Sequence, residues 1–161
     1  VSLFYPLLRK IPFLKILLIS FSWAYSTVAL IYFENNLDFN QNYKLSIISR
    51  IFFILGITIP FDIRDIKHDQ LKINTIPLVF GVGVAKKIAL TFLVIYLCIE
   101  CYLNLEVFAL NFIISASLCF FYSFFIISQL NNNNSDYYYS FWLESCSISL
   151  LVFLIITSIL L

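Results

Sequence analysis

Long apolar runs separated by short polar stretches dominate the pattern of this 161-residue chain. Each run approaches the roughly 20 residues that an α-helix needs to cross a bilayer, and the first, at 16–33, contains no charged residue. The pattern predicts an all-α integral membrane helical bundle, a single transmembrane domain over 1–161 with five transmembrane helices. The predicted spans are 16–33, 43–60, 88–103, 107–128 and 141–161.

Composition agrees with a membrane protein. Hydrophobic residues make up 61% of the chain and charged residues 12%, against roughly 25% charged in soluble domains. The net charge of +1 gives no reason to expect nucleic-acid binding. All four cysteines, including the Cys98-x-x-Cys101 pair, lie inside apolar runs, so we interpret them as small buried hydrophobes rather than as a disulfide framework, a redox pair or metal ligands.

Charge is concentrated in the segment 62–87, which holds five of the ten basic and three of the nine acidic residues. On a helix, Asp62, Asp65 and Asp69 would fall within an arc of roughly 60° and over about 10 Å of length. Three carboxylates on one face repel each other, so the spacing predicts a bound cation. For a cluster of hard oxygen ligands, Mg²⁺ is the first candidate.

Basic residues alternate with these acids. Arg64, Lys67 and Lys72 would contact the phosphate oxygens that a metal leaves uncovered, which makes a diphosphate the expected ligand. The alternative is a solvated charged loop in which the Arg and Lys side chains pair with the acids internally. His68 is not on the face of the aspartates, and we expect it at the surface.

The distribution of charge also predicts orientation. Most basic residues lie in 1–15 and 62–87, which share one side if the spans alternate. By the positive-inside rule, the Asp-rich segment faces the cytoplasm, and we expect a bacterial inner membrane. Pro60 is expected to kink or end the second span just before Asp62.

Of the charged residues that fall within predicted spans, Arg50 and Glu144 each have two interpretations. Arg50 could bind a ligand, although snorkelling or an interhelical partner is the simpler interpretation. Glu144 could line an acceptor pocket or cap the fifth helix, and we favour the cap. Trp142 and the three tyrosines at 137–139 are interpreted as interface anchors.

The residues FDIRDIKHD, followed by Thr75, Pro77 and Gly81, resemble the second aspartate-rich motif of the UbiA-type intramembrane prenyltransferases, D-x-x-D-x-x-x-D. The arrangement of the predicted spans around this motif is also similar to that of the family. The resemblance implies helices 5 to 9 of the nine-helix UbiA fold, with the motif after the second span of this chain. The family's first motif, N-D-x-x-D-x-x-x-D, is nowhere in the sequence, so we expect amino-terminal helices that carry it to precede Val1.

What the resemblance implies is Mg²⁺-dependent transfer of a prenyl group from a prenyl diphosphate to an aromatic or other lipophilic acceptor. Asp62, Asp65 and Asp69 would hold the metal, and Arg64, Lys67 and Lys72 the diphosphate. Activity would need the amino-terminal helices. The alternative is a family relative without catalysis that serves as a membrane structural or lipid-binding subunit.

Two further classes of membrane protein match the sequence less well. CDP-alcohol phosphotransferases carry a D-G-x-x-A-R element, which this sequence lacks. A transporter would place its charged site near the bilayer midplane, whereas the aspartates follow the second span.

Overall fold

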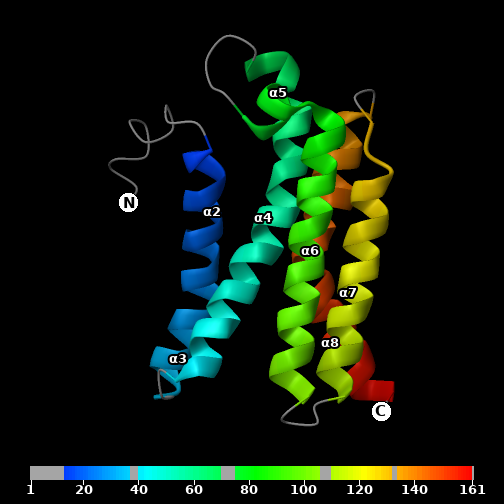
Figure 1. The fold of residues 1–161 in the computed structure, drawn as a ribbon. Coiled ribbons are helices and arrows are strands. Elements are labelled where there is room, and N and C mark those ends of the chain that lie inside the picture. Colours follow the sequence, from blue (N-terminus) through cyan, green and yellow to red (C-terminus); the bar gives the residue numbers. More distant parts are fainter. Residues whose placement is uncertain (1–12, 37–39, 70–74, 106–109, 132–133, 161) are drawn as a thin grey trace.

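The computed structural model describes residues 13–36, 40–69, 75–105, 110–131 and 134–160, with only the backbone of 67–69. The described elements are all helical (Figure 1). Five helices are long and apolar enough to cross a membrane, which confirms the predicted all-α bundle with five spans. They are Leu14–Glu34, Gln41–Ile66, Val82–Leu105, Leu110–Ser128 and Tyr138–Leu160.

Two of these spans are built from more than one helical segment. The first and the last span each contain a short π-helical stretch. In such a stretch each backbone hydrogen bond joins residues five apart in the sequence instead of four. The elements are α2 (Leu14–Ala24), η1 (Tyr25–Ala29), α3 (Leu30–Glu34), α4 (Gln41–Asp69), α5 (Ile76–Phe80), α6 (Val82–Leu105), α7 (Leu110–Ser128), η2 (Tyr138–Leu143) and α8 (Glu144–Leu160).

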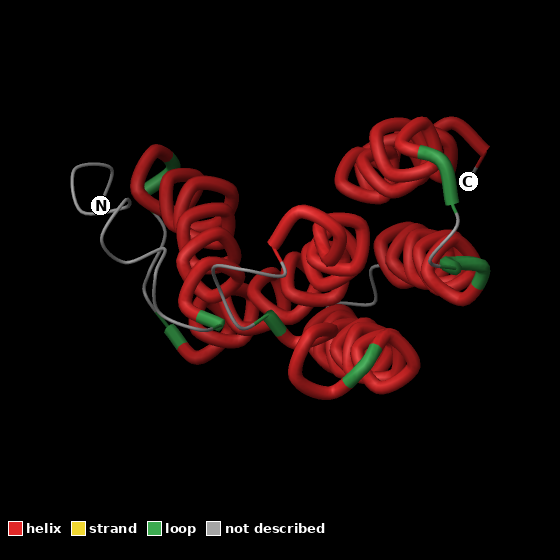
Figure 2. The backbone as a smooth tube through the Cα atoms, turned by 90° about the horizontal axis from the view of Figure 1, so that it is seen from above, coloured by secondary structure: helices red, strands yellow, loops and turns green. Residues whose placement is uncertain are grey.

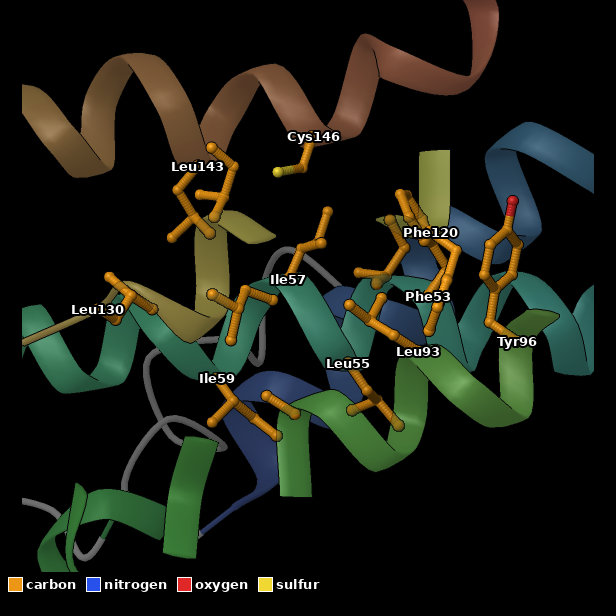
Figure 3. Packing of buried hydrophobic residues seen from close by; sticks show 14 of the residues in the cluster. Phe53, Leu55, Ile57, Ile59, Leu93, Tyr96, Phe120, Leu130, Leu143 and Cys146 are labelled. Carbon is orange, nitrogen blue, oxygen red and sulfur yellow. The ribbon is translucent and has the colours of Figure 1, made fainter. Parts of the chain in front are cut away.

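Helix α4 is the centre of the bundle. Its most apolar window is 56% buried, against 22% to 39% for the other four spans. It crosses between α2 and the group formed by α6, α7 and α8 (Figure 1), and from above the helices appear end-on beside one another (Figure 2). In Figure 3, Leu93 and Tyr96 approach α4 from α6, and Leu143 and Cys146 from the opposite side.

The second span does not end at Pro60, contrary to the sequence-based expectation. Helix α4 continues through this proline to Asp69. Ile59 and Pro60 are both almost completely buried, and inside a membrane a broken helix would expose backbone groups that lipid cannot satisfy. The packing on both sides of Pro60 therefore outweighs the one hydrogen bond it removes, and Asp62 and Asp65 project from a helix.

Large apolar side chains cover much of the outer surface. Phe121 is 64% exposed, Phe125 61% and Ile159 77%. In water such a surface would aggregate, whereas in a bilayer it faces lipid tails. The exposed faces therefore agree with an integral membrane protein.

The tyrosine cluster before α8 does not serve as a uniform interface anchor, which corrects that part of the prediction. Tyr139 is 2% exposed, and the hydroxyl of Tyr138 donates a hydrogen bond to the Ile126 carbonyl at 2.7 Å. Tyr137, at 63% exposed, is the one that remains at the surface. The fifth span begins at Tyr138, so two of the three rings pack within the bundle.

Lys86 caps the carboxyl end of α7. Its Nζ donates to the carbonyl oxygens of Ser128 and Leu130, at 2.9 and 2.7 Å, and these carbonyls lie at the negative end of the helix dipole. We expect Lys86→Gln to lower the free energy of unfolding by about 1 kcal/mol. Thermal unfolding in detergent would measure the effect. Lys87→Gln, at the exposed neighbouring position, is the matched control and should change stability little.

Candidate functional site

Charged side chains meet where the start of α2 lies beside the end of α4. Lys15 Nζ is 3.2 Å from Asp62 Oδ1 and 3.9 Å from Asp65 Oδ2, and Arg64 Nε donates to Asp65 Oδ1 at 2.8 Å. We call these four residues the charged cluster. The Asp62 side chain is 5% exposed and that of Asp65 is 25%, so solvent screening is weak at Asp62 and stronger at Asp65.

The antiparallel arrangement of α2 and α4 creates this meeting. Lys15 lies in the first turn of α2, and Asp62 and Asp65 in the last turns of α4. Asp62 and Asp65 are three residues apart, so they occupy neighbouring positions on one face of the helix. One lysine can therefore contact both carboxylates.

The amino-terminal end of the fifth span adds more charge to this end of the bundle. Asp136 and Glu144 are within electrostatic reach of Arg64, and the buried ring of Tyr139 is within reach of Arg64 and Asp65. Acids and bases are therefore mixed at this end of the bundle, and Arg64 lies within electrostatic reach of acids from both α4 and the fifth span.

An apolar cavity of about 200 Å³ lies beside α4. Two lining residues come from the first span, Trp23 and Thr27, and three from the fifth, Leu143, Glu144 and Ser147. Helix α4 supplies the rest of the wall from one face: Arg50, Phe53, Ile54, Ile57, Thr58 and Phe61.

Phe61 connects the cavity to the charged cluster. Its ring lines the cavity, and the Arg64 guanidinium carbon lies 5.4 Å from the centre of the same ring, in a cation–π contact. From Phe61 the cavity wall extends to Arg50, about 16 Å along the helix at 1.5 Å per residue. A molecule with a charged head and an apolar tail could place the head at the cluster and the tail in the cavity.

Arg50 lines the far part of this cavity, deep in the second span. Its Nε is buried and has no hydrogen-bond partner among the described residues. The neighbouring Ser49 donates a hydrogen bond to Glu100 Oε1 at 2.5 Å, across the interface of α4 and α6. Glu100 is 7% exposed and lies within electrostatic reach of Arg50.

Of the six site residues predicted from sequence, the structure brings three together: Asp62, Asp65 and Arg64. Lys72 and the side chains of Lys67 and Asp69 lie outside the described residues. Within the described part of the chain, no group of three or more His, Cys, Asp or Glu side chains is placed to hold a metal ion. The donor set of Asp62 and Asp65 still suits Mg²⁺, because that ion often takes only one or two carboxylates and fills its shell with phosphate and water.

Lys15 is the member of the cluster that the sequence did not suggest. The sequence nonetheless contains a signal for the contact between Lys15 and Asp62, because the two residues lie almost equally far from the polar connection at 34–42. Antiparallel helices joined by a short loop place such positions side by side. We expected Glu144 to cap the fifth helix, but it lies where η2 joins α8, inside a span that begins at Tyr138; it lines the cavity.

A comparison of the chain with protein-family models, with curated proteins and with solved structures finds no match.

Proposed function

We propose that this chain forms part of a Mg²⁺-dependent membrane prenyltransferase, which transfers a prenyl group from a prenyl diphosphate to an aromatic or other lipophilic acceptor. The observation that carries the proposal is the continuity of the charged cluster with the apolar cavity through Phe61. A prenyl diphosphate has the same division, with a compact anionic head and an apolar tail. The likeness of the aspartate spacing to the UbiA-type motif supports the same chemistry.

Each residue has a defined role in this proposal. Asp62 and Asp65, with Asp69, would hold Mg²⁺, which supplies the positive charge that the leaving diphosphate needs. Arg64, Lys67 and Lys72 would bind phosphate oxygens. The bond between the first prenyl carbon and oxygen breaks with its electron pair on the diphosphate, and the acceptor then bonds to that carbon and loses a proton. Apolar walls such as Phe53 and Ile57 would keep water from the allylic cation.

The proposal includes partners and a location. Helices that carry a first aspartate motif would complete the metal site, in a nine-helix arrangement of which this chain forms helices 5 to 9. The acids would face the cytoplasm of a bacterium, and bilayer lipid would surround the bundle.

A transfer assay tests this function. Membranes containing the full-length protein should convert radiolabelled farnesyl or geranylgeranyl diphosphate into a product that extracts into organic solvent. This product should differ from the free prenol that phosphatase releases from the diphosphate. Chelation with EDTA should stop the reaction, and Mg²⁺ should restore it. Label recovered only as unreacted diphosphate or free prenol, at every Mg²⁺ concentration, would contradict the proposal.

A second candidate is a membrane structural or lipid-binding subunit without catalysis. It is favoured by the ion pairs themselves, since Lys15 and Arg64 already neutralise Asp62 and Asp65 internally. The two candidates differ in metal binding. Titration with Mn²⁺, followed by electron paramagnetic resonance, should show saturable binding for the enzyme and only weak surface binding for the subunit.

A further inference from the structure

We propose that Arg50 and the adjoining cavity bind a long-chain carboxylate, with the carboxylate on the Arg50 guanidinium and the apolar chain directed towards Phe61. This site lies at the opposite end of the cavity from the charged cluster. Binding here requires no prenyl transfer, so either proposal can be correct without the other.

The first argument is the unmet donor on Arg50. Its Nε is buried without a hydrogen-bond partner, and the described residues form no ion pair with its guanidinium. A buried donor left without a partner costs free energy, and more so when it carries charge. Arg50 also lines the cavity, so an anionic group bound there would lie beside its side chain and could form charge-assisted hydrogen bonds with it.

Glu100 does not take this role. Its Oε1 accepts the hydrogen bond from Ser49 at 2.5 Å, within the packed interface of α4 and α6. It is close enough to act on Arg50 electrostatically, but the described residues form no hydrogen bond or ion pair between the two side chains.

The second argument is the shape and chemistry of the walls. The lining residues of α4, from Arg50 to Phe61, span about 16 Å of the helix. An extended chain could lie along this row of side chains. Trp23, Phe53 and Ile57 line it and would contact an alkyl chain along its length.

The charges at the two ends determine the orientation. Arg50 is at one end, whereas Glu144 lines the other near the acids of the charged cluster. A carboxylate would be repelled at the Glu144 end and attracted at Arg50. Arg50 lies about 14 Å along α4 from Gln41, a depth that a flexible amphiphile from the nearer leaflet could reach with local thinning of the lipid.

The two tryptophans of the chain allow a direct test. Trp23 lines the cavity and Trp142 does not, so in Trp142→Phe the tryptophan fluorescence comes from Trp23 alone. The chain in phosphatidylcholine nanodiscs is titrated at alkaline pH with a dibrominated fatty acid, and separately with the dibrominated alcohol of the same chain. The acid should quench Trp23 at about a tenfold lower concentration than the alcohol, as one charge-assisted hydrogen bond would give.

Variants then assign the preference to Arg50. In the Trp142→Phe background, Arg50→Gln should remove the difference between acid and alcohol, and Arg50→Lys should keep part of it. Lys44→Gln, an exposed site on the same helix, should keep it fully. Trp23→Phe, which leaves Trp142 as the reporter, gives the baseline for partition into lipid.

Two results would overturn the proposal. One is equal quenching of Trp23 by acid and alcohol in Trp142→Phe itself, which needs no substitution at Arg50. The other is a preference for the acid that survives Arg50→Gln or that Trp142 reports equally. Loss of prenyl transfer would leave these binding results unchanged.

Discussion

Replacing Asp65 with Asn in the full-length protein should reduce prenyl transfer by about a hundredfold to a thousandfold, the usual effect of removing one group that stabilises charge in a transition state. Asn has nearly the shape of Asp, and the Asp65 side chain is 25% exposed, so we expect the fold to persist. The loss would come from the charge that holds Mg²⁺ beside the leaving diphosphate. Asp69→Asn should have a similar effect.

The same transfer assay, with Mn²⁺ binding measured in parallel, checks this result. Saturable Mn²⁺ binding should weaken in Asp65→Asn together with the rate. Glu34→Gln removes one negative charge at an exposed position on the opposite end of the first span, and it should retain both properties. An Asp65→Asn protein that transfers prenyl groups at the original rate would exclude a metal role for this carboxylate.

The length of the apolar runs was sufficient to predict five membrane helices, because runs of this length have few alternatives in a bilayer. It was not sufficient for the course of the helix through Pro60. The local rule that proline ends a helix gives no weight to tertiary packing, and here Ile59 and Pro60 are buried against the rest of the bundle. The consequence is functional, since Asp62 and Asp65 are fixed by the same rigid helix as the cavity wall.

The candidate site was predictable only in part, for a related reason. Spacing within one helix placed Asp62 and Asp65 on a common face, and the structure agrees. Contacts between helices were beyond that reasoning, so Lys15 entered only as one of the basic residues that predict the orientation. The cavity could not be predicted from the sequence either, because its walls come from three spans and depend on how α4 packs between α2 and α8.

The close approach of α4 to α6 depends on a single glycine, and Gly56→Ala should destabilise the bundle by about 1–3 kcal/mol. A Cβ at position 56 would lie 2.9 Å from Leu93 Cδ2 and 3.2 Å from the carbonyl oxygen of Ala89. Leu93 is completely buried, so it has no free space into which to move, and the backbone carbonyl cannot move independently. Small residues serve the same purpose at helix contacts in many membrane proteins.

Resistance to unfolding in increasing sodium dodecyl sulfate would measure the change, and Gly83→Ala is the matched control. A Cβ at Gly83 would meet nothing within 4 Å, and alanine has the higher helix propensity, so this variant should be as stable as the original or slightly more so. Gly56→Ala should also couple energetically to Leu93→Ala, because shortening Leu93 removes the nearest clash. Additive effects of the two substitutions would show that the helices separate freely at this point, contrary to the packing of α4 on α6.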